Sequence, residues 1–306
     1  MADKTGISWS DATWNPATGC SKVSPGCGLP RFDGDKSGGC YAMAMAARLK
    51  KMGQRKYQND GLPPLSGPGF GVTTHPDALG IPLRWTKPRK IFVNSMSDLF
   101  HAEIPSPFIA EVFAVMAAAH QHTFQVLTKR HARMRSLLND DGFAQAVNTA
   151  YNCLPSDVPS WRGYQWPLPN VWLGVSAEDQ HWADIRIPVL LDTRAAVRWV
   201  SAEPLLGTVD FTCCDGTDAL GPDWIGSPAG GTGAPHALLD WIVCGGESGP
   251  DHREMNVAWV KDIARQCEHS DVPIWVKQDS AFRDGQQGRI PDELWIHEFP
   301  REAVSR

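Results

Sequence analysis

The sequence is poor in the features that assign a protein class at once. It has no apolar run of membrane-spanning length, and its start, "MADKTGISWSDATW", lacks the apolar segment of a secretory signal. Its 29 basic residues are outnumbered by 34 acidic ones, which excludes the strongly basic composition of a dedicated nucleic-acid coat or a basic membrane binder. These absences predict a cytoplasmic protein with no membrane partner.

Cysteine, in contrast, is well represented. In a reducing compartment, eight cysteines are more often free thiols or metal ligands than disulfides. Three of them, Cys20, Cys27 and Cys40, lie among small and turn-forming residues in "TGCSKVSPGCGLPRFDGDKSGGC". The other five are expected to be mostly structural thiols: Cys153, Cys213, Cys214, Cys244 and Cys267.

Six short apolar runs, each ending in small polar residues, predict buried strands. Runs that are apolar throughout are typical of strands covered on both faces, as in a parallel sheet. The runs are Lys90–Asp98, Phe124–Arg130, Val171–Asp179, Val197–Pro204, Trp241–Ser248 and Ile274–Ser280. A further strand before Cys20 brings the total to about seven.

Helical patterns separate several of these strands. Ser106 and Pro107 form a typical cap and first-turn pair, and apolar residues follow at helical spacing. Residues 257–267 repeat that spacing, whereas residues 183–193 form a weaker helix because Pro188 interrupts it. The alternation predicts the α/β class. We expect a single-domain partial (β/α) TIM-like barrel of about six or seven parallel strands, with a doubly wound open sheet as the alternative.

Three segments break the alternation, near residues 53–84, 139–169 and 205–236. They are rich in glycine, proline and other turn-forming residues. Long segments of this kind in a compact domain are usually functional or mobile. We interpret them as insertions on one domain that spans residues 1–306.

In a barrel, binding and catalytic groups gather at the carboxyl ends of the strands. Here those ends carry donors, acceptors and Gly-rich backbone, which suit a polar ligand that has both an amine and a carboxylate. The residues are Asn94, Ser95, Ser97, Asp98, Thr128, Lys129, Arg130, Ser176, Glu178, Asp179, Ser201, Glu203, Gly245, Gly246, Glu247, Ser248, Lys277, Gln278 and Asp279. The alternative is that any α/β protein turns polar where its strands end.

Two acids stand out, Glu203 in "SAEP" and Glu247 in "GGES", because each directly follows an apolar run. A buried acid is costly unless it is paired or binds a ligand. Each therefore predicts either a ligand contact or an ion pair with a cation such as Lys129, Arg130 or Lys277.

The spacing of the three clustered cysteines is C-x6-C-x12-C. A disulfide would leave one thiol over, and a closed zinc site would need a fourth ligand such as His75 or Cys153. Thiolates also hold iron–sulfur clusters. A four-iron cluster held by three thiolates leaves one iron open as a reaction site. The remaining alternative is that the thiols are buried as small hydrophobes.

The opening "SWSDATWNPATGCSKVSPGC…CYAMA" resembles that of an uncharacterised phage and prophage family. Further matches, in order along the chain, are "IFVNSMSDLFH", "HTFQVLTKR", "NVWLGVSAEDQ", "RWVSAEPLLG", "WIVCGGESGP" and "VPIWVKQ". That family resembles the radical S-adenosylmethionine superfamily, and its cysteine loop is similar to that of spore photoproduct lyase. In the family, two residues usually separate the second and third cysteines, whereas twelve do so here.

The resemblance implies a [4Fe-4S] cluster ligated by Cys20, Cys27 and Cys40, with S-adenosylmethionine on the open iron. Reduction would then give a 5′-deoxyadenosyl radical that abstracts a substrate hydrogen. By position, Tyr41 would help hold the adenine, and Asn94 to Asp98, including Ser95, would contact the methionyl amine. Further ligand contacts would come from Ser176, Glu178, Glu203, Gly245, Gly246 and Glu247.

The substrate expectation is a nucleotide or nucleic acid. Lys129, Arg130 and Lys277 are candidates for holding an anionic substrate, and Lys129, Lys277 and Glu203 are the candidate catalytic residues. The basic stretch "KRHARMR" fits phosphates, although it is equally typical of a solvated helix start. An electron donor is required, and a protein encoded nearby is a candidate partner.

Two other functions stay open. One is a zinc-stabilised or metal-free binding protein without catalysis. The other is a metal-independent hydrolase that uses Glu178, Glu203 or Glu247 as acid or base. The sequence contains no P-loop, G-x-S-x-G or H-E-x-x-H motif that would support a hydrolase.

Overall fold

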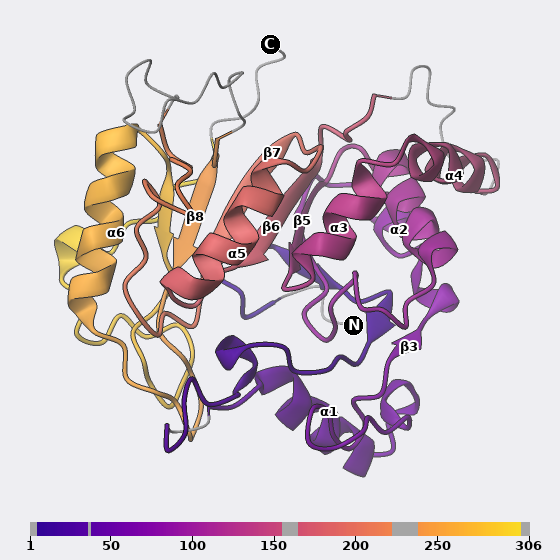
Figure 1. Ribbon diagram of the computed structural model, residues 1–306. Coiled ribbons are helices and arrows are strands. Elements are labelled where there is room, and N and C mark those ends of the chain that lie inside the picture. Colours follow the sequence, from indigo (N-terminus) through magenta and orange to yellow (C-terminus); the bar gives the residue numbers. More distant parts are fainter. Residues whose placement is uncertain (1–4, 36–37, 155–164, 222–237, 301–306) are drawn as a thin grey trace. The chain divides into compact units, whose positions relative to one another are not determined.

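Seven strands follow one another in chain order across one sheet (Figure 1), with the order β1-β4-β5-β6-β7-β8-β9. The computed structural model describes residues 5–35, 38–154, 165–221 and 238–300 of the 306. The chain has the α/β class that the sequence predicts, a partial barrel of seven parallel strands with helices between them. Contacts divide it into two compact units, residues 1–173 with 194–196, and residues 174–193 with 197–306.

The first unit contains three neighbouring parallel strands, β1 (Ala12–Trp14), β4 (Lys90–Val93) and β5 (Thr123–Thr128). Its helices are α1 (Tyr41–Lys51), α2 (Ser106–Ala118), α3 (His131–Leu138) and α4 (Asp141–Asn152), and α2 packs against α4. A small antiparallel pair joins β2 (Ala17–Thr18), which lies just before Cys20 in the chain, to β3 (Thr73–Thr74). Short 3-10 helices complete the unit: η1 (Pro25–Cys27), η2 (Arg55–Tyr57), η3 (Pro76–Ala78) and η4 (Pro82–Arg84).

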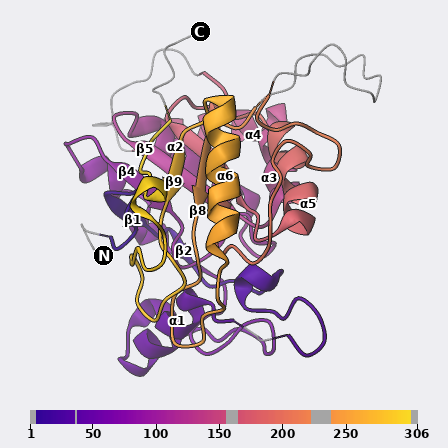
Figure 2. The same ribbon diagram turned by 90° about the vertical axis from the view of Figure 1, so that its left-hand side faces the viewer.

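The second unit contains β7 (Val197–Ala202), β8 (Trp241–Cys244) and β9 (Ile274–Val276), again parallel neighbours. Its helices are α5 (Gln180–Leu191), α6 (Val257–Ser270) and the 3-10 helix η5 (Asp292–Leu294). Figure 2 shows α6 running beside β8, and it also contacts β9. β6 (Val171–Ser176) crosses the boundary between the units and is buried at every residue, as its apolar sequence predicts.

All six apolar runs contain a strand, β4 to β9, which confirms the strand predictions. The helices predicted after Ser106 and over 257–267 are also present. The predicted cap is wrong: α2 begins at Ser106 itself, with Pro105 in the cap position and no side-chain capping bond. The Ser106 hydroxyl instead accepts a long hydrogen bond from Arg133. Pro188 lies inside α5 without ending it.

The three predicted insertions differ in content. Residues 53–84 hold three 3-10 helices and β3. The segment 139–169 contains α4, a helix that the sequence pattern does not predict. Its residues 155–164 lie outside the described residues. In the segment 205–236, residues 222–236 also lie outside the described residues.

Within the part of the chain that the structure describes, no helix has the length and apolar character needed to span a membrane.

Candidate active site

The three clustered cysteines belong to the first unit and to three different local elements. Cys20 follows β2, Cys27 ends η1, and Cys40 occupies the cap position at the start of α1. Burial is the main cause of the raised pKa of Cys20 and of Cys40, and a charge on Cys27 would raise both further.

The long gap between Cys27 and Cys40 closes on itself. Gly28 has φ +88, and a Cβ on it would lie 2.4 Å from the carbonyl oxygen of Gly38. Only glycine permits both this conformation and this approach. Gly28 and Gly38 therefore lie next to each other, although nine residues separate them in the sequence. Without residues 29–38, two residues, Gly28 and Gly39, would separate the cysteines, which is the shorter spacing of the resembling family.

Apolar packing brings two of the cysteines onto a common surface. Ala42 and Ala46 on the inner side of α1 form a buried cluster with Phe70 and Met96, and Cys20 and Cys40 both pack against it. This cluster fixes the start of α1 against the segment that follows β4.

Burial makes Cys20 and Cys40 poor acids in the metal-free protein. Burial, together with the nearby Asp98 carboxylate, raises the pKa of Cys20 to about 12, while the Arg130 guanidinium opposes that rise. Burial also raises the pKa of Cys40, and the backbone N–H groups of Met43 and Ala42, with the Lys129 ammonium, act against it. Thiolates here need a further cation to be stable, which a metal centre would supply.

Arg130 connects Cys20 to a polar network. Its Nη2 donates to the Ser21 hydroxyl at 2.9 Å and to the Ser21 carbonyl at 3.1 Å, and lies 4.0 Å from the Cys20 sulfur. The buried Arg130 Nε has no hydrogen-bond partner. His101 Nε2 lies 2.9 Å from the Ser21 hydroxyl, and its Nδ1 accepts from the Glu103 backbone. Arg130 and His101 thus hold the residue after Cys20 from two sides.

The segment after β4 lies against this region. Ser97 in this segment forms a parallel β-bridge with Gly19, the residue before Cys20. The Ser97 hydroxyl also donates a hydrogen bond to the Ala17 carbonyl. Asn94, only 4% exposed, donates from Nδ2 to Ser97 at 2.8 Å, but its Oδ1 is buried without a hydrogen-bond partner. An unsatisfied buried acceptor is costly, so it marks a place where a ligand donor would be stabilising.

The Asp98 carboxylate accepts three hydrogen bonds from residues of the first unit. The donors are the Thr128 hydroxyl at 2.7 Å, the Lys129 backbone N–H at 2.9 Å and the Phe100 backbone N–H at 3.0 Å. Asp98 therefore ties the end of β5 to the end of β4. Because Lys129 also acts on the Cys40 thiol, these contacts bring the ends of two strands close to the cysteines.

Tyr41 and Ser95 meet at the start of α1. The Tyr41 hydroxyl donates to the Ser95 carbonyl at 3.0 Å, while 56% of the residue stays exposed. The Ser95 hydroxyl exchanges contacts with the Asn15 side chain. Cys20, Cys27, Cys40, Tyr41, Asn94, Ser95, Asp98 and Lys129, all predicted from sequence, are thus gathered in the first unit.

In the second unit the predicted acidic residues meet cations of that same unit. Glu178 and Arg186 are both fully buried, and Arg186 Nη1 donates to Glu178 Oε2 at 2.9 Å and to the Ser176 carbonyl at 2.8 Å. Two further nitrogens of Arg186 are buried without a partner, and its guanidinium lies 4.1 Å from the ring centroid of Trp182. Arg186 lies inside α5, where no local pattern marks it as the partner of Glu178.

Glu203 and Glu247 form the other two pairs. Glu203 binds the Lys277 ammonium, one of the ion pairs that the sequence left open. Glu247 binds Arg253 through both oxygens, with Nη2 to Oε1 at 2.8 Å and Nε to Oε2 at 2.9 Å. Arg253 lies six residues after Glu247 and is not among the cations predicted as its partners.

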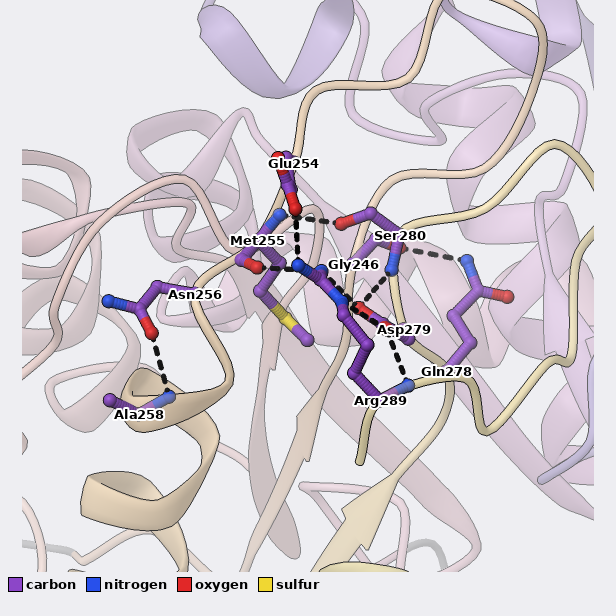
Figure 3. Close-up of polar contacts among 9 residues, drawn as sticks. All are labelled: Gly246, Glu254, Met255, Asn256, Ala258, Gln278, Asp279, Ser280 and Arg289. Carbon is purple, nitrogen blue, oxygen red and sulfur yellow. Dashed lines mark hydrogen bonds and ion pairs between the residues drawn. The ribbon is translucent and has the colours of Figure 1, made fainter. Parts of the chain in front are cut away.

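The Gly245–Gly246 pair packs tightly against the end of β9. A Cβ on Gly246 would lie 2.3 Å from the Ser280 nitrogen, and Gly246 exchanges hydrogen bonds with Gln278 at 2.8 and 2.9 Å. Figure 3 shows how the neighbouring Asp279 is held by Arg289, with Nη2 to Oδ1 and Nε to Oδ2 both at 2.8 Å. These contacts give the two glycines a packing role within the unit.

The two suggested fourth ligands of a zinc site have other surroundings. His75 Nε2 lies 2.9 Å from the Thr18 hydroxyl, and burial lowers the pKa of His75 to about 4. Cys153 is exposed at the end of α4. In the described part of the chain, no three Cys, His, Asp or Glu side chains are grouped to hold a metal ion. The thiolates of a four-iron cluster bind separate iron atoms, so they stand farther apart than the ligands of a single ion.

The fold and the site together define an α/β protein of partial-barrel type with three free thiols in the segment between β2 and α1. A family model described as "Protein of unknown function (DUF5131)" matches residues 4–298, and the chain belongs to this family. No match is found among curated proteins or among solved structures.

Proposed function

We propose that the protein is a radical S-adenosylmethionine enzyme, in which Cys20, Cys27 and Cys40 ligate a [4Fe-4S] cluster. The observation that carries this proposal is that Cys20 and Cys40, both free thiols, pack against the same buried cluster, with Cys27 in the segment that joins them. The closure of residues 29–38 at Gly28 and Gly38 supports it, because the long gap then leaves the grouping intact.

The charges around the thiols support the same cofactor. A cluster with three thiolates is anionic, and Arg130, Lys129 and the first-turn amides of α1 would offset that charge. When bound and reduced, such a cluster supplies the electron that cleaves a C–S bond of S-adenosylmethionine, yielding methionine and a 5′-deoxyadenosyl radical. The protein's part is to bind, orient and exclude water.

The unsatisfied Oδ1 of Asn94 supports a contact with the amine of S-adenosylmethionine. An ammonium group is a strong donor, and a buried carbonyl oxygen that lacks a partner would bind it without giving up another bond. Tyr41 is the first residue of α1 and its ring is exposed, which supports a role in covering the adenine. Ser95, bonded to Tyr41 through its carbonyl, would hold that ring in place.

For the substrate we propose a nucleotide or nucleic acid held in part by Lys129. The basic stretch 129–135 contributes less than its sequence suggests. Arg133 donates to the carbonyls of His101 and Ile104, and Arg130 to Ser21, so both are used inside the unit. Lys277 and Glu203 remain a proposed catalytic pair, supported by their mutual contact. The reaction also needs an external electron donor.

Anaerobic reconstitution with iron and sulfide, followed by reductant and S-adenosylmethionine, tests the proposal. We expect a brown protein that forms 5′-deoxyadenosine. Cys20→Ala, Cys27→Ala and Cys40→Ala should each lose iron and product together. Cys153→Ala and Cys213→Ala, at two exposed cysteines outside the group, serve as matched controls and should keep both.

Two results would contradict the proposal. A colourless protein that fills with zinc and cleaves no S-adenosylmethionine would identify a zinc-stabilised binding protein. A hydrolytic activity that survives all three cysteine changes would identify a metal-independent hydrolase.

A further inference from the structure

The outward face of α1 carries large apolar side chains in a line. Met45, Arg48 and Met52 are spaced three and four residues apart, so they lie along one face of the helix and its end. Met45 is 39% and Met52 62% exposed, and Arg48 is also exposed. These three residues are the α1 stripe.

The inward face of the same helix already has its apolar contacts. Ala42 and Ala46 are buried against Phe70 and Met96, and Met43 packs against the same cluster. An ordinary surface helix places its large apolar residues inward and its polar residues outward. Here Met45 and Met52 remain exposed, although other residues of the helix anchor it. An exposed apolar row of this kind is typical of a surface that another molecule covers.

The stripe lies in a segment of one charge sign. Residues 36–58 contain six basic residues, Lys36, Arg48, Lys50, Lys51, Arg55 and Lys56, and no acidic residue, in a chain whose net charge is −5. Basic residues at a helix end are favoured by the helix dipole, which accounts for part of this excess. Lys50 pairs with Asp60. Lys51 and Arg55 are exposed beside the stripe, so they give it a cationic border.

We propose that the α1 stripe is the docking surface for an acidic protein partner. Methionine and arginine are among the residue types enriched in protein interfaces, and these two types form the stripe. Methionine thioethers offer little to a nucleic acid, which binds through phosphate contacts and base stacking, but they pack well against aliphatic side chains. The cationic border selects for acidic groups around that apolar contact. This inference does not depend on the chemistry proposed for the cysteines.

The test is selection of a random peptide library displayed on phage against the immobilised full chain. Selected peptides, made synthetically, are then measured by fluorescence anisotropy. We expect them to combine acidic with aliphatic or aromatic residues. Met45→Gln with Met52→Gln, and separately Arg48→Glu with Lys51→Glu, should each weaken binding about tenfold or more. The charge-reversed variant should also lose the salt dependence of binding.

Matched changes elsewhere provide the control. Lys261→Glu with Arg265→Glu reverses two exposed charges on α6, and Phe282→Gln removes an exposed aromatic ring. Both should bind like the original chain, and circular dichroism should show all variants folded.

Several outcomes would overturn the inference. Selected peptides without acidic residues would contradict the proposed docking surface. So would peptides whose affinity is the same for the α1 variants and the original chain. Competition by single-stranded oligothymidine that depends on Arg48 and Lys51 would assign the stripe to nucleic acid. A concentration-dependent dimer that Met45→Gln with Met52→Gln abolishes would make a second copy the occupant.

Discussion

The strand ends of the first unit and those of the second are both polar, yet their polar groups are used differently. In the second unit, Glu178, Glu203 and Glu247 each meet a cation within the unit. In the first unit, Asn94 Oδ1 is buried without a partner beside a segment that contacts the cysteine region. A polar strand end therefore says little about ligand binding until its partners are known. The two unsatisfied nitrogens of Arg186 belong to a guanidinium that already pairs with Glu178, whereas Asn94 Oδ1 is an acceptor with no partner, so it is the stronger signal of a ligand.

The largest effect that we expect comes from breaking the buried pair in the second unit. Glu178→Ala leaves the fully buried Arg186 without its carboxylate, and an uncompensated buried charge costs about 3–5 kcal/mol. Urea denaturation measures the free energy of unfolding. Glu254→Ala, which removes an exposed partner of Arg289, is the control and should cost about 0–1 kcal/mol.

This result would also separate the two uses of a carboxylate. If Glu178→Ala left stability unchanged but removed S-adenosylmethionine binding, the second unit would hold a ligand site, and the contrast between the units would fail. Replacing both partners, Glu178→Leu with Arg186→Met, should recover much of the stability because no charge remains buried.

The next effect concerns the closure of residues 29–38 in the first unit. Gly28→Ala introduces a left-handed alanine and a Cβ 2.4 Å from the Gly38 carbonyl oxygen. Gly34→Ala, inside the same loop, has the same kind of φ, +83, but its Cβ meets nothing within 4 Å. We expect Gly28→Ala to be less stable than Gly34→Ala by about 2 kcal/mol, because only it adds a clash. Urea denaturation and iron per reconstituted chain would both be measured.

Deleting residues 29–38, which joins Gly28 to Gly39, tests the same closure from the other direction. Iron binding should survive, since the two cysteines would keep the separation that the loop already gives them. Loss of iron in the deletion, together with normal iron in Gly28→Ala, would show that the loop itself contributes to the site.

A smaller effect is expected at Asn94. Asn94→Ala removes the unsatisfied acceptor and should weaken S-adenosylmethionine binding to the reconstituted protein about tenfold or more, because the lost contact would involve a charged amine. Stability should change little, since an uncompensated cost disappears together with the bond to Ser97. Ser97→Ala is the control, because it removes that bond and keeps Oδ1. Calorimetry without reductant gives the affinity, and equal binding by Asn94→Ala would contradict the assignment.

Much of the fold could be predicted because buried parallel strands have a strong local signature. All of β4 to β9 lie in runs that are apolar throughout, and α6 shows its inward face in the spacing of its apolar residues. α4 was missed because it lies in a segment flanked by turn-forming residues. The cap of α2 was misplaced by one residue because Ser106 interacts with Arg133, a tertiary contact that local sequence does not encode.

The candidate site could be predicted only as a set of residue types. Cysteine spacing singled out three thiols, but the approach of Gly28 to Gly38 depends on a loop whose path the sequence does not specify. The partners of the acids were hidden for the same reason. Arg186 and Arg253 lie in stretches that look like an ordinary helix and an ordinary loop, and only the fold turns them toward Glu178 and Glu247.

The smallest effect expected compares buried thiols of the two units at alkaline pH. Burial raises the pKa of Cys267 in α6 to about 12, as it does for Cys20, from an ordinary value of 9.0. Above pH 9 the unfolded chain loses these protons while the folded chain keeps them, so the free energy of unfolding falls as pH rises. In the metal-free protein, Cys20→Ala and Cys267→Ala should each reduce that fall by about 1 kcal/mol at pH 10. After reconstitution with iron, a ligated Cys20 has no proton to lose, so only Cys267→Ala should still reduce it. Urea denaturation at pH 8 and 10 measures the difference, and an equal effect of both changes in the reconstituted protein would count against ligation by Cys20.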